Sequence, residues 1–359
     1  PGSRGVRSGG ATPFDHGEAL QMDSGIRLYA GTAGHSAWFS SDRGETWVHP
    51  NSHSGMYTEA RVWCLSSHPS DPELLYAGSD MGLFRWRESV ARWEPMPSPM
   101  QDVWALAQDP RDPSLILAGT RPGGLWRSTD AGATWAQADT PGVAAFSEIN
   151  RGPTRVTQIL FDPYEPDTVW SGIEIGGVWR SRDRGRSWTL LQQGLVSGDV
   201  HGIAVWRDAD GTRHLLATTN KGLHRSTDEG EHWTHEPIDS PWQYERAIVL
   251  APDGRTLWMT NGNGPPGSSG RLLRSTDGGR SWQERPLPGT TNSTVWCVAA
   301  HPSDPSLLFT CTNLGQVFRS DDAGETWTRL PREFGEIRAL HWRPAAGATT
   351  GTHATWTYR

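Results

Sequence analysis

The stretch STDAGATW (residues 128–135) decides the fold, because near-copies of it recur along the whole chain. Each copy reads Ser, any residue, Asp, any residue, Gly, any residue, Thr or Ser, and Trp, and only His232 departs at the Thr/Ser position. Asp can accept hydrogen bonds from backbone N–H groups across a tight turn, and Gly adopts a positive φ at little cost. The pattern predicts a repeated structural turn, called the box below. The boxes span 40–47, 128–135, 181–188, 226–233, 275–282 and 320–327.

A second pattern precedes each box. In VWCLSSHPSDPELLYAGS (62–79) and VWCVAAHPSDPSLLFTCT (295–312), an apolar run, a Pro/Asp turn and a second apolar run follow one another. A third short run leads into the box, and the box Trp opens a fourth. Four strands per unit, without helical periodicity, are typical of propeller blades. The Trp that ends each unit recurs every 42 to 53 residues, at 47, 93, 135, 188, 233, 282 and 327, where the copy around Trp93 has lost its Asp and Gly.

These repeats predict an all-β, seven-bladed β-propeller with four antiparallel strands per blade. The first copy lacks an inner strand, and IRALHW (337–342) matches the missing strand, so the C-terminal strand should complete the first blade and close the ring. We expect an N-terminal extension over 1–25, one propeller over 26–344 and a C-terminal tail over 345–359. The predicted blades lie near 26–47 plus 337–342, 62–96, 103–137, 156–190, 200–235, 244–284 and 295–329.

Composition excludes several classes of function. The chain has 359 residues and a net charge of −7, with no basic block, so we expect no nucleic-acid partner. No apolar run approaches the length of a membrane span. Residues 1–10 contain no apolar signal core, which favours a soluble cytoplasmic protein, or a secreted one if a signal was trimmed. Three Cys cannot form a disulfide framework, and Cys297 and Cys311 are predicted either to pair across strands or to be small buried thiols.

The boxes resemble the Asp-box, or BNR, repeat of sialidases, xyloglucanases, sortilin-type receptors and a photosystem II assembly factor. The resemblance covers about 26–342. It implies the propeller fold and leaves the function open, because unrelated functions use the same fold. Sialidases of this class typically have six blades and begin with a Phe/Tyr-Arg-Ile-Pro motif, which this chain lacks. Xyloglucanases of this type have two propellers with a cleft between them, and this chain has the length of one.

Two rows of dissimilar residues stand out where the inner strands begin. Repetition should have made these rows alike, but they are polar and aromatic and differ from blade to blade. Alternation along a strand places both rows near one mouth of the central channel. One row holds Trp63, Trp104, Thr157, His201, Arg246, Trp296 and Arg338, and the other, two residues earlier, holds Arg61, Asp102, Arg155, Asp199, Tyr244, Thr294 and Glu336.

The rows have two interpretations. In the first, Arg61, Arg155, Arg246 and Arg338 form a pocket for an anion, because guanidinium groups match carboxylate, phosphate or sulfate. Trp63, Trp104 and Trp296 would then stack on a sugar or another ring. In the second, the arginines pair with neighbouring acids and fill the channel with salt bridges. The acids available for such pairs are Asp102, Asp199, Glu245 and Glu336.

The same rim supplies candidate catalytic groups. Glu174 lies in a loop predicted to project over the mouth, and Asp199 or Asp80 could act as an acid. Tyr244 beside Glu245 is similar to the tyrosine–glutamate pair of sialidases. His201 is either a general base or a hydrogen-bonded channel residue.

Three functions therefore stay open: a site for a sugar or anionic small molecule with glycoside-hydrolase-like chemistry, a scaffold for a protein partner, or a lyase. No motif predicts a cofactor, and no metal site is expected.

Overall fold

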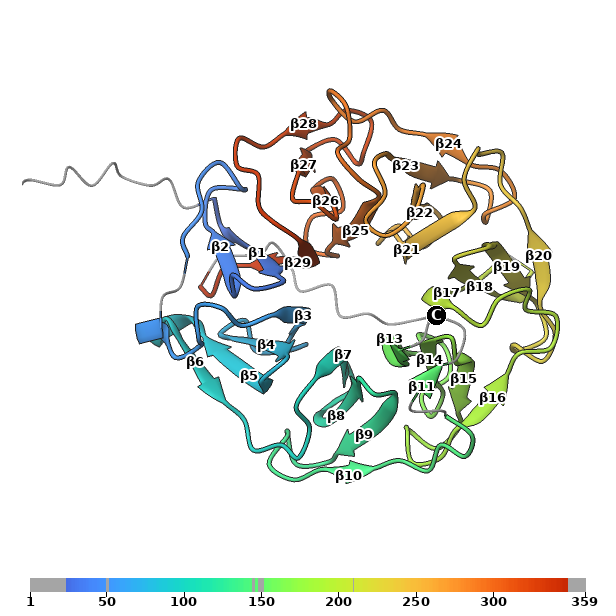
Figure 1. Cartoon of the computed structure of the whole chain (residues 1–359), viewed down its shortest axis with the longest axis horizontal. Coiled ribbons are helices and arrows are strands. Elements are labelled where there is room, and N and C mark those ends of the chain that lie inside the picture. The colour runs from blue at the N-terminus through green and yellow to red at the C-terminus, as the bar shows by residue number, and fades with distance from the viewer. Residues whose placement is uncertain (1–23, 50–51, 144–145, 148–151, 209, 348–359) are drawn as a thin grey trace, which may run out of the picture.

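The computed structural model describes residues 24–49, 52–143, 146–147, 152–208 and 210–347. It shows seven small sheets arranged as blades around a central channel, which confirms the predicted all-β, seven-bladed propeller (Figure 1). The only helical elements described are two short 3₁₀ turns, η1 (Ser52–Ser54) and η2 (Glu88–Val90). Most of the expected N-terminal extension and C-terminal tail lies outside the described residues.

Six blades consist of four antiparallel strands each, numbered outward from the channel. Blade 2 contains β3 (Val62–Ser67), β4 (Leu74–Ser79), β5 (Gly82–Arg87) and β6 (Arg92–Pro95), and blade 3 contains β7 (Val103–Asp109), β8 (Asp112–Thr120), β9 (Gly124–Ser128) and β10 (Ala136–Gln137). Blade 4 contains β13 (Arg155–Phe161), β14 (Val169–Glu174), β15 (Gly177–Ser181) and β16 (Thr189–Leu191). Blade 5 contains β17 (Val200–Arg207), β18 (Arg213–Thr219), β19 (Gly222–Ser226) and β20 (Thr234–Glu236). Blade 6 contains β21 (Tyr244–Leu250), β22 (Leu257–Gly262), β23 (Gly270–Ser275) and β24 (Gln283–Glu284). Blade 7 contains β25 (Val295–Ala300), β26 (Leu308–Thr312), β27 (Val317–Ser320) and β28 (Thr328–Arg329).

Blade 1 joins the two ends of the propeller. Its inner strand is β29 (Ile337–Pro344), which pairs antiparallel with β1 (Ile26–Thr32), and β1 pairs with β2 (Ala37–Ser40). An isolated bridge between Phe39 and Val48 stands where a fourth strand would lie. The predicted closure by the C-terminal strand is therefore confirmed. A small hairpin of β11 (Phe146–Ser147) and β12 (Gly152–Pro153) precedes blade 4.

The hydrophobic core is a series of clusters between neighbouring blades. Trp233, from the box of blade 5, packs with Trp170, Val178 and Leu191 of blade 4 and is only 4% exposed. The other box-position tryptophans repeat this contact with the preceding blade around the whole ring. A Trp buries a large apolar area, so these residues hold the blades together. They are Trp47, Trp93, Trp135, Trp188, Trp282 and Trp327.

The six boxes share one set of hydrogen bonds. In the last box, the Ser320 hydroxyl donates to Asp322 (2.7 Å), and the Thr326 hydroxyl donates to the other Asp322 oxygen (2.6 Å). The N–H of Gly324 donates to Ser320 Oγ (2.8 Å). Gly324 has φ +81°, and a Cβ there would lie 2.2 Å from Trp258 of the preceding blade, so no other residue fits. His232 replaces the hydroxyl with its ring Nδ1, 2.7 Å from Asp228.

Cys297 and Cys311 lie opposite each other on β25 and β26, and both are free thiols. The prediction of buried thiols therefore describes this structure better than a disulfide.

Candidate functional site

A β-bulge in every inner strand positions the residues at the channel mouth. In β3, Val62 and Cys64 pair with consecutive residues of β4, so Trp63 is left without a partner in the ladder. A bulge of this kind re-aims a side chain, and bulges are common beside functional sites. All seven inner strands carry a bulge at the same place. The residues it displaces are Trp63, Trp104, Thr157, His201, Arg246, Trp296 and Arg338, which is the first row that sequence alignment identified.

Tryptophans and arginines at these bulges, together with Arg155 two residues before the bulge of blade 4, form a continuous cluster. Trp63 and Trp104 stack with ring centroids 4.1 Å apart and an angle of 12° between their planes. The Arg155 guanidinium carbon lies 4.4 Å from the Trp104 ring centroid. Arg338 lies within 5.9 Å of the ring centroids of Trp63, Trp104 and Trp296. The side chains of blades 2, 3, 4, 7 and 1 therefore meet around the channel.

Arg246 completes the cluster from blade 6. Its guanidinium carbon lies 3.9 Å from the Trp296 ring centroid. Its positive charge lowers the pKa of the neighbouring Tyr244 phenol, against the larger effect of burial. Among the described residues it forms no ion pair, and its buried Nη1 has no hydrogen-bond partner there. Arg246 therefore has donors to spare for an acceptor from outside the chain.

The other two arginines of the cluster are paired with acids. Arg155 forms an ion pair with Glu174, and Arg338 forms one with Glu336. Burial, together with the positive charges of Arg246 and Arg155, lowers the pKa of Arg338 to about 10. Three guanidinium groups thus repel one another in a partly dry site, and an added anion would relieve that repulsion. The salt-bridge interpretation describes Arg155 and Arg338 and does not describe Arg246.

Arg61 lies apart from the cluster, whereas Asp102 contacts it. Arg61 is exposed, its backbone N–H donates to Asp80 (2.9 Å), and no described contact joins its side chain to the cluster. Asp102 accepts a hydrogen bond from Trp63 Nε1 (2.6 Å) and orients the stacked rings.

Glu245 lies in the interior of blade 6. Its carboxyl is completely buried, and its nearest donor is the Asn261 side chain at 3.4 Å. Burial raises the pKa of Glu245 to about 8. It occupies the position directly before the bulge, which is a fully buried valine in blades 2 to 5 and 7. Among the described residues the Asn261 side chain donates to the Glu245 carboxyl, and no described hydrogen bond joins that carboxyl to the Tyr244 phenol.

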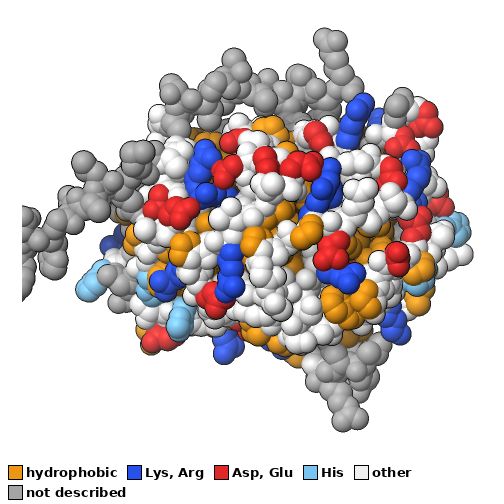
Figure 2. Space-filling model, turned by 90° about the horizontal axis from the view of Figure 1, so that it is seen from above, with side chains coloured by type: hydrophobic (Ala, Val, Ile, Leu, Met, Phe, Trp, Pro, Cys, Tyr) orange, Lys and Arg blue, Asp and Glu red, His pale blue; other side chains and the backbone are white. Residues whose placement is uncertain are grey.

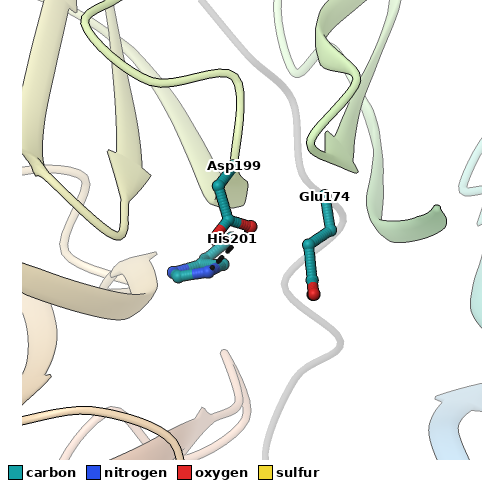
Figure 3. Close-up of side chains that lie close together, drawn as sticks. All are labelled: Glu174, Asp199 and His201. Carbon is teal, nitrogen blue, oxygen red and sulfur yellow. Dashed lines mark ion pairs between the residues drawn. The ribbon is translucent and has the colours of Figure 1, made fainter. Parts of the chain in front are cut away.

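Glu174, Asp199 and His201 come together at the junction of blades 4 and 5 (Figure 3). Glu174 ends β14, and Asp199 immediately precedes β17. His201 Nε2 lies 3.3 Å from Asp199 Oδ1, and the His201 ring packs against Tyr244 with centroids 5.0 Å apart. Burial lowers the pKa of His201, and Arg246 lowers it further. Burial also raises the pKa of Tyr244, which disfavours a phenolate.

Arg121 was missed by the alignment of inner strands. Its guanidinium carbon lies 5.9 Å from the Trp104 ring centroid. It follows β8 at the position where Glu174 ends β14, so aligning the ends of the second strands would have found it.

No helix among the described residues is long and apolar enough to cross a membrane. Acidic and basic side chains are interspersed on the side of the disc shown in Figure 2.

Comparison with known proteins places the chain near two groups of propellers. No protein-family model matches it. A xyloglucanase of Paenibacillus sp is 28% identical over 316 residues, which are 73% of this chain and 30% of the relative. The chain thus spans less than a third of that relative's length.

Solved structures show the same fold. The GH74 enzyme of Niastella koreensis superposes with a TM-score of 0.59 at 23% identity, over 75% of this chain and 45% of that one. YCF48 bound to a D1 peptide superposes with a TM-score of 0.51 at 16% identity, over 75% of this chain and 82% of that one.

Proposed function

We propose that the channel mouth binds an anionic ligand that carries a ring, with an acidic sugar as the best fit. The observation that carries this proposal is Arg246, a guanidinium stacked on Trp296 with no acid paired to it among the described residues. A carboxylate would accept its free donors. The stacked Trp63 and Trp104 offer an aromatic face for the ring. The matching hydrogen bonds of the six boxes support our assignment of these turns to the Asp-box repeat.

The test is calorimetric titration of the full chain with glucuronate, galacturonate and sialic acid, with glucose and xylose as neutral comparisons. We expect the acidic sugars to bind and Arg246→Gln to weaken that binding at least about tenfold. Arg280→Gln is the matched control, because Arg280 is exposed at a box turn. Binding that Arg246→Gln leaves unchanged, or no saturable binding of any acidic sugar, would contradict the proposal.

A glycoside-hydrolase-like reaction at the same mouth is supported by the similarity to a xyloglucanase and by the two carboxylates Glu174 and Asp199. An oxygen of each lies within 4.8 Å of the other. A glycoside hydrolase of the usual kind needs two carboxyl groups on opposite sides of the scissile bond. Any hydrolysis of chromogenic glycosides should therefore be abolished by Glu174→Gln and by Asp199→Asn. Turnover that survives both substitutions would remove these groups from the reaction.

A protein partner is the second candidate function. Five of the seven exposed large hydrophobic residues among those described lie on the connections at the mouth face, four on loops and Phe146 on the short strand β11: Tyr57, Met81, Phe146, Val196 and Leu314. Exposed apolar residues around a polar centre are typical of interaction surfaces. In this case a peptide with a free C-terminal carboxylate should bind through Arg246 and its amidated form should not, while acidic sugars fail to bind. Equal binding of both forms would exclude this mode of recognition.

A further inference from the structure

His201 is held in one tautomer by the backbone of blade 6. Its Nδ1 lies 2.5 Å from the carbonyl oxygen of Glu245. A carbonyl oxygen can only accept, so Nδ1 carries the hydrogen. The His201 side chain is 1% exposed, so the ring cannot turn to exchange its nitrogens through solvent. The other nitrogen, Nε2, therefore presents a lone pair whenever the imidazole is neutral.

That lone pair faces a carboxylate. Asp199 Oδ1 lies 3.3 Å from His201 Nε2, is buried, and has no hydrogen-bond donor among the described residues. Two acceptors in contact repel each other unless a positive species lies between them. No described side chain donates a hydrogen bond to Asp199 Oδ1, so no positive species lies between the two acceptors.

Glu174 adds a third ligand atom from blade 4. One atom from each of Glu174, Asp199 and His201 lies within 4.8 Å of the other two, and the three side chains approach one another in Figure 3. One imidazole and two carboxylates suit a transition-metal dication, because Mg²⁺ and Ca²⁺ prefer oxygen ligands alone. Zn²⁺ accepts this combination and in catalytic sites has three protein ligands and one open position. A carbonyl that accepts the other ring N–H is the usual support for a metal-bound His.

We propose that His201 Nε2, Asp199 Oδ1 and a Glu174 carboxylate oxygen bind one divalent transition-metal cation, with Zn²⁺ as the reference ion. Arg155 and Arg246 flank the three ligands and offset their negative charge. We therefore expect a micromolar dissociation constant, weaker than that of a closed structural zinc site. This inference is independent of the acidic-sugar proposal, because it concerns the chain without any sugar.

The experiment is isothermal titration of the full chain, stripped with a chelator, with Zn²⁺ alone and with Mg²⁺ as comparison. Bound zinc is also counted by elemental analysis after gel filtration. We expect one Zn²⁺ per chain and no comparable binding of Mg²⁺. His201→Gln and Asp199→Asn should each weaken Zn²⁺ binding at least about tenfold.

His232→Gln is the matched control. His232 and Asp228 also form a His–Asp pair (2.7 Å), but it is exposed on a box turn and lacks a third ligand. This variant should bind Zn²⁺ like the parent chain. Far-UV circular dichroism verifies folding, and Asp199→Asn keeps the shape of the side chain in case His201→Gln fails to fold. Absence of 1:1 binding, or loss in His232→Gln with retention in Asp199→Asn, would overturn the proposal.

Discussion

Two sets of arginines lie on different strands of the blades and are used in different ways. The first set lies on the third strand of successive blades and is used for assembly. Arg180, for example, donates to the Glu229 carbonyl (2.7 Å) and to Glu231 (2.9 Å) in the box of the next blade. Arg127, Arg274 and Arg319 contact the next box in the same way.

The second set lies on the innermost strands and differs from blade to blade. Arg155 and Arg338 are paired with acids, and Arg246 is stacked on Trp296 without one among the described residues. A repeated residue serves a contact that several blades make, whereas an unrepeated one is free to serve a site. In this ring, divergence between the repeats marks the candidate site better than residue type does.

The largest expected difference is between a tryptophan at a contact between blades and a tryptophan at the channel mouth, measured as the free energy of unfolding that each substitution removes. Trp233→Ala, at the blade 4–blade 5 contact, should lower the free energy of unfolding by about 3–5 kcal/mol, because it leaves a cavity between two sheets. Trp104→Ala, at the partly exposed mouth, should cost less than about 2 kcal/mol. Urea unfolding followed by far-UV circular dichroism measures both. Equal losses would mean that the mouth tryptophans also hold the ring together.

The next largest difference should be in how much the two sets of arginines contribute to the free energy of unfolding. Arg180→Gln removes two hydrogen bonds of a side chain that is only 9% exposed, so the free energy of unfolding should fall by about 2 kcal/mol. Arg246→Gln should cost less than about 1 kcal/mol, mainly the cation–π contact with Trp296. The same urea experiment compares them. A larger loss in Arg246→Gln than in Arg180→Gln would reverse the assignment of structural and site arginines.

The smallest expected difference is in pH dependence. Hydrogen bonds within the boxes lower the pKa of Asp322 from 3.8 to about 2, so its stabilisation is complete above pH 3.8 and is lost as the pH falls through 2. Glu245 behaves in the opposite way. Its pKa rises from 4.5 to about 8 on folding, so stability declines as the pH rises from 4.5 to 8.

Glu245→Gln should remove the decline between pH 4.5 and 8, and Asp322→Asn should reduce the loss below pH 3.8. Thermal melting across pH 2–9 tests both substitutions. A decline near pH 8 that persists in Glu245→Gln would show that another group causes it.

Local patterns predicted the blades and the boxes well. The box is a turn of eight residues in which the hydrogen bonds of Ser, Asp and Thr/Ser stay within the turn, so its geometry followed from its own residues. The missing inner strand of blade 1 was also predictable. IRALHW resembles the other inner strands, and blade 1 was the blade whose sequence copy lacked such a strand.

The mouth was predicted in part. Row alignment identified Trp63, Trp104, Arg246 and Arg338, since the bulge lies at the same place in every inner strand. It identified Arg155 through the second row, two residues before the bulge of blade 4. It did not separate Arg61 from the cluster. It also treated Glu245 as a rim carboxylate, although Glu245 takes the position of a buried valine.

By itself, the sequence determined the number of blades, the closure of the ring and the turn at each box, because these depend on contacts between residues near one another or on repetition. Only the tertiary structure decided which mouth side chains meet. Those partners come from different blades, some 25 to 275 residues apart, such as Asp102 with Trp63 and Arg338 with Trp63. Their pairing depends on bulge geometry and on distances across the channel, which no local pattern encodes.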